Sequence, residues 1–210
     1  YLKQTKVTKE EAIVDVIAKV SNGFDKQAVI KSRVTILDAN SAIVAKTEES
    51  AQVEPGQTKS VNNQIRITNP HLWNGRKDPY LYQAKVEILC DGNVVDEIGG
   101  TLGTLGLRYY SADTNKGFLL NGESYPLHGV NCHQDRIGKG WAISYEDQKQ
   151  DANIIEEMGA TCVRLAHYPH SDYFHLLCDK SGLVVWAEIP MVNQVYDTPA
   201  FTENAKQQLT

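Results

Sequence analysis

The first half of the chain alternates apolar and polar positions with a period of two. The clearest run is Val14, Val16, Ala18 and Val20, which share one parity. The same alternation returns over residues 30–36 and 61–67, and it is typical of strands with one buried face. Turn-forming residues separate the runs, as at Asp91-Gly92-Asn93, which predicts a hairpin. About seven short strands without a helix predict an immunoglobulin-like β-sandwich over residues 1–109.

From residue 110 onward, short apolar runs alternate with helical patterns. The runs cover residues 125–130, 161–166 and 183–187. The third is apolar on both parities, as expected of a strand buried on both faces of a parallel sheet. Strand, helix, strand, helix, strand is a repeated βαβ unit, and a further helix is expected from about residue 202. Three parallel strands do not close, so the second domain, residues 110–210, is expected to be incomplete or docked on something else.

Two predicted helices carry signals at both ends. The first is expected to begin at Ser144, with Asp147 three residues on as in a capping box, and to stop at Gly159. The second is expected to begin at Ser171 and to stop at Gly182. The side chains that these helices are expected to bury are Ile154, Ile155, Met158, Tyr173, Phe174 and Leu177.

Composition and charge exclude several classes of partner. The formal charge of -5 provides no basic field for a phosphate backbone, so nucleic acid is not expected to bind. No apolar run is long enough to cross a bilayer, and no membrane partner is expected. The chain begins at Tyr1 without a signal-peptide pattern, as expected of a piece of a longer protein. Its compartment, and whether the parent is a homo-oligomer, stay open.

The four cysteines form no pattern of known chemistry. They lie far apart without a CxxC pair, so the sequence predicts neither a disulfide framework nor a zinc knuckle, and buried free thiols are expected. A zinc site made by convergence in three dimensions is the alternative. Its candidate ligands are Cys132, His133, Cys162, His167, His170 and Cys178.

Polar residues stand at the end of each predicted parallel strand, where βα barrels carry their working groups. These residues are Asn131, His133, Arg164, His167 and Glu188. A neutral imidazole offers one donor and one acceptor, which suits sugar hydroxyls, although both histidines have packing as an alternative role. Arg164 lies inside an apolar strand, so it is expected to pair with a carboxylate or to orient an acid from a later strand. For Glu188 the alternative is a rim ion pair.

The same stretches resemble the family 2 glycoside hydrolases. The motifs that resemble the start of that family's barrel are residues 117–122, 128–133, 163–169, 177–179 and 182–185. Residues 69–73 and 79–82 resemble the late part of the immunoglobulin-like domain that precedes the barrel. The resemblance implies a sandwich followed by the first three strands of an incomplete (β/α)8 TIM barrel.

The resemblance also implies roles for individual residues. His133 and His167 match the two family histidines that bind the sugar, and Asn131 and Arg164 match residues that line the same pocket. Glu188 is predicted to face this pocket as well, so all five are candidate substrate-binding residues. Family members are retaining enzymes with two glutamates, which must stand about 5 Å apart. Both glutamates lie on later strands of the barrel and are expected beyond Thr210. The resemblance therefore implies no catalytic residue within the chain, and no hydrolysis by the chain alone.

The end of the third strand bears on cofactor and substrate. Many galactosidases of the family hold magnesium there through a glutamate and a histidine, whereas residues 186–193 read Trp-Ala-Glu-Ile-Pro-Met-Val-Asn. The histidine is missing, so no metal site is predicted and a magnesium requirement of the parent stays open. The segment Trp186–Pro190 is more similar to galactosidases, so a terminal β-galactoside is the predicted substrate. Terminal β-glucuronides and β-mannosides are the alternatives.

A noncatalytic reading belongs to a different class of function. A sandwich can serve as a carbohydrate-binding or interaction module, because fold does not fix function. Such modules use exposed aromatic side chains, and the candidates here are Trp73, Tyr80 and Tyr82. Packing in the corner of the sandwich or at its contact with the barrel is the expected role of all three. The polar strand ends of the second domain favour the enzyme reading.

Overall fold

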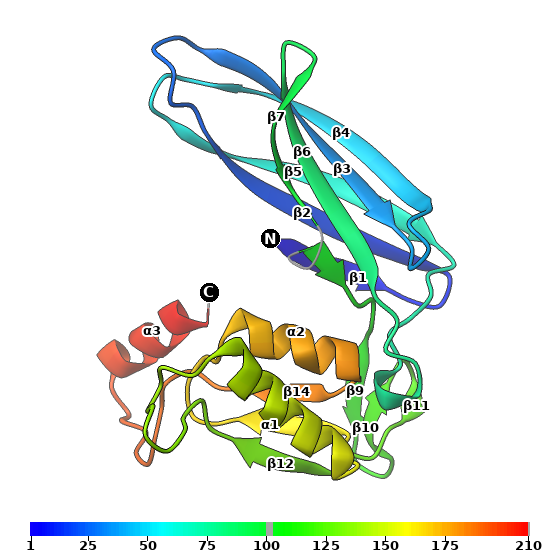
Figure 1. Cartoon of the computed structure of the whole chain (residues 1–210), viewed down its shortest axis with the longest axis vertical. Coiled ribbons are helices and arrows are strands. Elements are labelled where there is room, and N and C mark those ends of the chain that lie inside the picture. Colours follow the sequence, from blue (N-terminus) through cyan, green and yellow to red (C-terminus); the bar gives the residue numbers. More distant parts are fainter. Residues whose placement is uncertain (100–102, 210) are drawn as a thin grey trace. The chain divides into compact units, whose positions relative to one another are not determined.

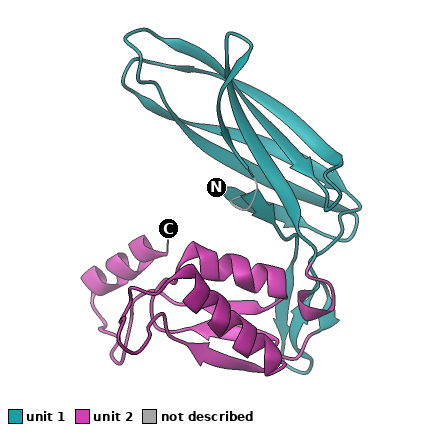
Figure 2. Cartoon of the chain, in the orientation of Figure 1, with its two compact units in different colours: residues 1–74, 80–124 teal, residues 75–79, 125–210 magenta. Residues whose placement is uncertain are grey.

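The computed structural model describes residues 1–99 and 103–209. Its two compact units (Figure 2) are residues Tyr1–Asn74 with Tyr80–Ser124, and residues Gly75–Pro79 with Tyr125–Thr210. The domain boundary between residues 109 and 110 stays a prediction; the structure groups residues 110–124 with the first unit. Thr210, the last residue of the predicted second domain, lies outside the described residues.

The first unit is a sandwich of two antiparallel sheets (Figure 1). One sheet has the order β1-β2-β5, and the other has the order β4-β3-β6-β7, with β8 paired to β6. The strands are β1 (Leu2–Val7), β2 (Glu11–Ser21), β3 (Ala28–Leu37), β4 (Ile43–Val53), β5 (Thr58–Thr68), β6 (Tyr82–Cys90), β7 (Asn93–Ile98) and β8 (Thr104–Leu105). The predicted sandwich is confirmed, and the predicted hairpin lies between β6 and β7.

The sandwich core follows the period of two that the sequence shows. In β2, Ala12, Val14 and Val16 are buried, and the residues between them are only half-buried. Val34 of β3 and Ile65 of β5 join them in one apolar cluster. Burial of one parity on each sheet explains why these segments form strands, because successive side chains of a strand point to opposite faces.

The aromatic side chains of the sandwich are used for packing. Trp73 and Tyr82 are 1% and 4% exposed. The Tyr82 hydroxyl accepts a hydrogen bond from the backbone N–H of His71 at 2.7 Å, and the Tyr80 ring stacks on the His71 ring at 3.8 Å. Trp73 and Tyr82 therefore do not provide the exposed aromatic face that a noncatalytic sugar-binding module needs.

A small antiparallel sheet closes the first unit. It has the order β11-β10-β9 and consists of β9 (Tyr110–Asp113), β10 (Gly117–Leu120) and β11 (Glu123–Ser124). Asn121, which is buried, follows β10 and donates hydrogen bonds from Nδ2 to the Trp73 carbonyl at 2.9 Å and to Asn74 Oδ1 at 2.7 Å. This one side chain ties the small sheet to the end of the sandwich.

The second unit is a three-stranded parallel sheet covered by helices. Its sheet has the order β12-β13-β14, with β12 (Gly129–Cys132), β13 (Cys162–Leu165) and β14 (Val184–Ala187). The helices are α1 (Tyr145–Glu157), α2 (Asp172–Ser181), α3 (Pro199–Gln208) and the 3₁₀ turn η1 (Gly75–Lys77). Figure 1 shows α1 and α2 side by side, and their buried residues share one core with β13. The predicted βα repeat is confirmed.

The ends of α1 and α2 follow the local sequence signals. Ser144 Oγ accepts from the Asp147 N–H and the Asp147 side chain accepts from the Ser144 N–H, which completes the predicted capping box. Ser171 caps α2, and Gly182 ends it in the left-handed region at φ 73°. The third helix begins at Pro199, earlier than the predicted position near residue 202, because Thr198 caps it.

Several side chains expected to be buried are exposed. Ile154 and Met158 of α1 are 48% and 64% exposed, whereas Ile155 is 5% exposed. The helical repeat of 3.6 residues places Ile154 and Met158 together on one side, and α1 turns the Ile155 side to the sheet. Trp186 of β14 is 66% exposed. The helical core takes only one face of the sheet, so β14 is not buried on both faces as the sequence suggested.

The short segment Gly75–Pro79 packs within the second unit, although its neighbours along the chain belong to the first. Arg76 Nη1 donates to the Ser181 carbonyl at 3.0 Å and pairs with Glu156 Oε1 at 2.9 Å. The Arg76 backbone N–H donates to the Tyr125 hydroxyl at 3.0 Å. These bonds fix the segment against the end of α2.

No helix in the described part of the chain is both long and apolar enough to span a membrane.

Candidate functional site

The residues predicted from the strand ends meet at the carboxyl edge of the parallel sheet. Asn131 of β12 lies in register with Arg164 of β13. His133 follows β12, His167 follows β13, and Glu188 follows β14. Because parallel strands all end at the same edge, residues far apart in sequence are brought together there.

Glu188 lies at the centre of this group. Its Oε1 accepts a hydrogen bond from Arg164 Nε at 2.6 Å, and its Oε2 lies 2.9 Å from His167 Nδ1. The Arg164 guanidinium, and then the His167 ring, hold the pKa of the Glu188 carboxyl below its ordinary value. Glu188 is therefore an ionised carboxylate with a partner on each oxygen.

Arg164 differs from the sequence expectation in its exposure. Its side chain is 41% exposed, so it is not a buried charge, although it has the carboxylate partner that was expected. Arg164 Nη1 lies 3.3 Å from Asn131 Oδ1, and Nη2 lies 3.2 Å from His167 Nδ1. The guanidinium thus connects residues from all three strands.

His133 borders the group on the side of the loop that follows β12. Its ring centroid is 5.5 Å from that of His167, in an edge-on arrangement. The Tyr168 hydroxyl lies 3.4 Å from His133 Nδ1 and accepts from the Gln134 N–H at 3.2 Å. The exposed Trp141 ring lies 4.6 Å from the Tyr168 ring. The sequence did not single out Tyr168 or Trp141; the position of Tyr168 directly after His167 is the only local signal.

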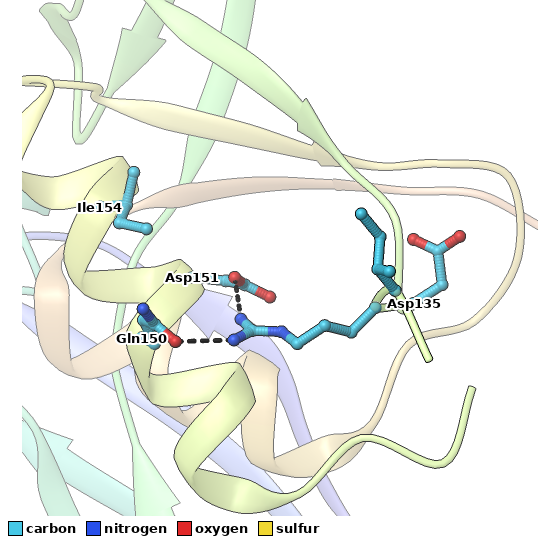
Figure 3. Close-up of a pocket in the computed structure, with 6 residues that line it drawn as sticks. Asp135, Gln150, Asp151 and Ile154 are labelled. Atoms are coloured by element: carbon cyan, nitrogen blue, oxygen red, sulfur yellow. Dashed lines mark hydrogen bonds and ion pairs between the residues drawn. The ribbon is translucent and has the colours of Figure 1, made fainter. Parts of the chain in front are cut away.

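A hollow beside the same loop is separate from this group. It is lined by Asp135, Arg136, Ile137, Gln150, Asp151 and Ile154 (Figure 3). The Arg136 guanidinium donates to Gln150 Oε1 at 2.6 Å and to Asp151 Oδ1 at 2.5 Å, as the dashed lines show. None of the five predicted site residues lines the hollow. Its arginine joins the loop to α1, which is a structural role.

The zinc alternative finds no support in the described residues. Within residues 1–99 and 103–209, no three His, Cys, Asp or Glu side chains are placed to hold a metal ion. Burial raises the pKa of the Cys132 thiol to about 11 and that of Cys178 to about 12. Zinc binds the thiolate, which these environments disfavour. His170 is buried and donates from Nε2 to the Ala166 carbonyl at 3.3 Å.

The cysteines are less buried than the sequence suggested. All four are free thiols, and Cys178 is buried, but Cys90, Cys132 and Cys162 are only partly buried. Cys132 and Cys162 lie at the two ends of neighbouring short strands, where the sheet edge leaves part of each side chain open. Cys178 is buried in the apolar core that α1 and α2 share with β13, and Cys132 packs against it.

The group at the strand ends is suited to binding. It combines an amide, a guanidinium and two imidazoles, which together donate and accept hydrogen bonds as sugar hydroxyls require. Glu188 has both oxygens occupied and a lowered pKa, so it is neither a free nucleophile nor a proton donor. The described residues therefore bring together binding groups around a fixed carboxylate.

Family models match both halves of the chain. A model described as "Glycosyl hydrolases family 2" matches residues 1–104, and one described as "Glycosyl hydrolases family 2, TIM barrel domain" matches residues 112–208. The chain belongs to glycosyl hydrolase family 2. The members of family 2 are glycosidases. The predicted fold, an immunoglobulin-like sandwich followed by the start of a TIM barrel, is confirmed.

Family 2 relatives match the chain along its whole length. A β-glucuronidase of Bacteroides fragilis is 38% identical over 100% of this chain and 30% of its own length. A putative β-glucuronidase of Formosa agariphila is 30% identical over 98% of this chain and 24% of its own length. The crystal structure of a putative β-galactosidase from Bacteroides fragilis has a TM-score of 0.88 and 40% identity, over 100% of this chain and 30% of that one. The chain thus spans less than a third of these relatives.

Proposed function

We propose that this chain supplies part of the sugar-binding site of a retaining glycosidase that cleaves terminal β-glycosidic bonds. The observation that carries the proposal is the group of five polar residues at the carboxyl ends of β12, β13 and β14. Its members are Asn131, His133, Arg164, His167 and Glu188. In a family 2 barrel this edge of the sheet faces the substrate.

In this proposal the chain binds the sugar and leaves bond cleavage to other residues. Retention needs two carboxyl groups about 5 Å apart, one as acid/base and one as nucleophile. Both Glu188 oxygens have partners, in Arg164 and His167, and the proposal assigns neither part to this residue. Both catalytic glutamates are predicted outside residues 1–210, and no turnover is expected from this chain alone.

Two sugars have support as the substrate of the longer protein. Two relatives that align over 98% or more of the chain bear the name β-glucuronidase, which favours a terminal β-glucuronide. The segment Trp186-Ala187-Glu188-Ile189-Pro190, which runs from the end of β14 into the following loop, favours a terminal β-galactoside, as does the solved structure at 40% identity. A β-mannoside has neither of these supports. We place the glucuronide first because two of the relatives that align over nearly the whole chain bear that name, against one solved structure named as a β-galactosidase.

The first test is hydrolysis of aryl β-glucuronide, β-galactoside and β-mannoside by this chain and by the longer protein that carries it. The longer protein is expected to cleave one of the three sugars, and this chain none of them. Release of the aryl group by this chain would place the essential carboxyl groups within residues 1–210. No hydrolysis of any sugar by the longer protein would contradict the proposed function.

A variant of His167 tests the site. In the longer protein, His167→Ala is expected to lower kcat/KM about 100-fold, because hydrogen bonds to sugar hydroxyls strengthen in the transition state. The matched control is His128→Ala: His128 is exposed, whereas His167 is half-buried, and His128 lies just before β12, at the amino end of the strand. Equal rates for the two variants would remove His167 from the site.

A further inference from the structure

His167 Nδ1 lies between one group that can only accept a hydrogen bond and one that can only donate one. Glu188 Oε2 is 2.9 Å away and, as an ionised carboxylate, can only accept a hydrogen bond. Arg164 Nη2 is 3.2 Å away and can only donate. In an uncharged imidazole, Nδ1 either carries the proton or presents a lone pair. One of the two contacts must therefore decide the tautomer.

The carboxylate contact is the stronger of the two. A bare Nδ1 facing Glu188 at 2.9 Å would set two lone pairs against each other. A protonated Nδ1 faces the Arg164 donor instead, but at a longer distance. Arg164 is also neutralised by the same carboxylate, through Nε at 2.6 Å. Hydrogen bonds to an ionised acceptor are about twice as strong as neutral ones, which favours the proton on Nδ1.

We propose that Glu188 is a positioning residue, which holds the uncharged His167 ring with its proton on Nδ1 and presents Nε2 as a bare acceptor. Resting on the proposed function, this assigns the ligand of His167 as a sugar hydroxyl that donates its proton. It also changes the role of Glu188 from the sequence prediction of substrate contact, because both of its oxygens already have partners within the protein.

The tautomer is directly measurable in this chain. In a long-range ¹H–¹⁵N correlation spectrum, a protonated ring nitrogen and a bare one have well-separated nitrogen shifts. The spectrum is recorded at about pH 8.5, about two units above the pKa of a free imidazole. His167 is expected to show a protonated Nδ1 and a bare Nε2. A protonated Nε2 in the wild-type chain would overturn the proposal.

The variant Glu188→Gln tests the cause. In this variant the amide oxygen is expected to accept from Arg164 Nε, which turns the amide NH2 toward His167 Nδ1 as a second donor beside Arg164 Nη2. The proton is therefore expected to move to Nε2 in most molecules. The control Glu156→Gln breaks another carboxylate–arginine pair, with Arg76, and is expected to leave the His167 spectrum unchanged. An unchanged tautomer in a folded Glu188→Gln chain would overturn the proposal.

A second variant keeps the test decisive if Glu188→Gln fails to fold. Arg164→Lys removes the Nη2 contact and retains a positive charge beside Glu188. The His167 proton is expected to stay on Nδ1 in this variant, and its loss from Nδ1 would contradict the leading role of Glu188.

The tautomer proposal and the proposed function can be contradicted separately, because different measurements test them. The spectrum requires no substrate and no turnover, so a protonated Nδ1 stands even if the longer protein cleaves no glycoside. Conversely, cleavage of one sugar together with a protonated Nε2 would retain the glycosidase and remove Glu188 as the group that sets the tautomer. In the longer protein, replacing the recognised hydroxyl by fluorine, which cannot donate, is expected to lower kcat/KM about 100-fold.

Discussion

Gly182 meets two constraints that only a residue without a side chain satisfies. It ends α2 with φ 73°, in the left-handed region that side chains disfavour. A Cβ placed there would also collide with the carbonyl group of Gly75 and with the Arg76 nitrogen. Gly159, after α1, shares the positive φ at 74°, but a Cβ there would meet nothing within 4 Å. Comparing substitutions at the two glycines therefore separates the cost of the left-handed backbone from the cost of a steric clash.

Alanine at these two positions is expected to have unequal effects. Gly159→Ala should lower the free energy of unfolding by about 1–2 kcal/mol, the cost of the left-handed conformation alone. Gly182→Ala should lower it by a further 1–3 kcal/mol or so, because the segment Gly75–Pro79 must move away. Urea unfolding of both variants beside the wild type measures the difference. Equal losses would show that the contact with Gly75 costs nothing.

The sequence predicted part of what these glycines do. It identified Gly159 and Gly182 as helix ends, because a helix stop is a local signal. The contact between Gly182 and Gly75 joins segments more than a hundred residues apart, and no local pattern carries it. The same division holds at the strand ends: the position of His167 follows from strand order, whereas the contact of Tyr168 with His133 depends on how a loop folds back.

At the scale of elements, the start of α1 concentrates several interactions on Asp147. Its carboxylate accepts from Lys139 Nζ at 2.6 Å and from the Ser144 N–H at 2.9 Å, and Arg136 Nη1 lies 3.3 Å away. The Lys139 bond, followed by that of the Ser144 backbone, lowers the Asp147 pKa from 3.8 to about 2. The residue thus caps the helix and also anchors the loop that follows β12.

This lowered pKa predicts how stability depends on pH. A carboxyl with a depressed pKa binds its proton more readily in the unfolded chain, so its contribution is complete above the unfolded pKa. The gap in unfolding free energy between wild type and Asp147→Asn should be constant from about pH 7 to 5. It should shrink as the pH falls from 3.8 towards about 2.

Urea unfolding at a series of pH values measures the gap between wild type and Asp147→Asn. Glu146→Gln, which removes a charge from the same helical turn, is the control for the general effect of charge. A gap that stays constant down to pH 2 would show that Asp147 gains nothing from Lys139 and Ser144.

Elements with a long sequence pattern were predicted correctly, whereas some elements with a short pattern were missed. The strands of the sandwich run over many alternating positions, and their burial follows parity. The small sheet β9–β11 has strands of two to four residues, too short for alternation to show, and it was not foreseen. The exposure of Trp186 was missed because an apolar run does not reveal that the helices cover only one face of its sheet.

At the scale of the whole molecule, the segment Gly75–Pro79 makes the second unit discontinuous in sequence. Arg76 provides most of the polar contacts of this segment, through Ser181, Glu156 and its own backbone N–H to Tyr125. Because the arginine is only partly exposed, its bonds are screened less than those of a surface pair. Removal of the side chain therefore tests whether the segment contributes to the stability of the unit.

Arg76→Ala is expected to lower the unfolding free energy by about 1 kcal/mol, the sum of a partly exposed ion pair and a charged hydrogen bond to a carbonyl. The control Arg66→Ala removes a more exposed arginine that pairs with Glu11, and should change stability by less than about 0.5 kcal/mol. Hydrogen exchange at the end of α2 should rise in Arg76→Ala only. Equal exchange in both variants would contradict the role of Arg76.

The discontinuity has a consequence for how the protein is made. Arg76 precedes its partner Ser181 by 105 positions in the chain. At a synthesis rate of about 5–20 residues per second, Arg76 leaves the ribosome about 5–20 s before the carbonyl that it binds. During that interval the sandwich can complete its own hydrogen bonds, while the guanidinium of Arg76 stays in water. The second unit can close only after translation has passed the end of α2.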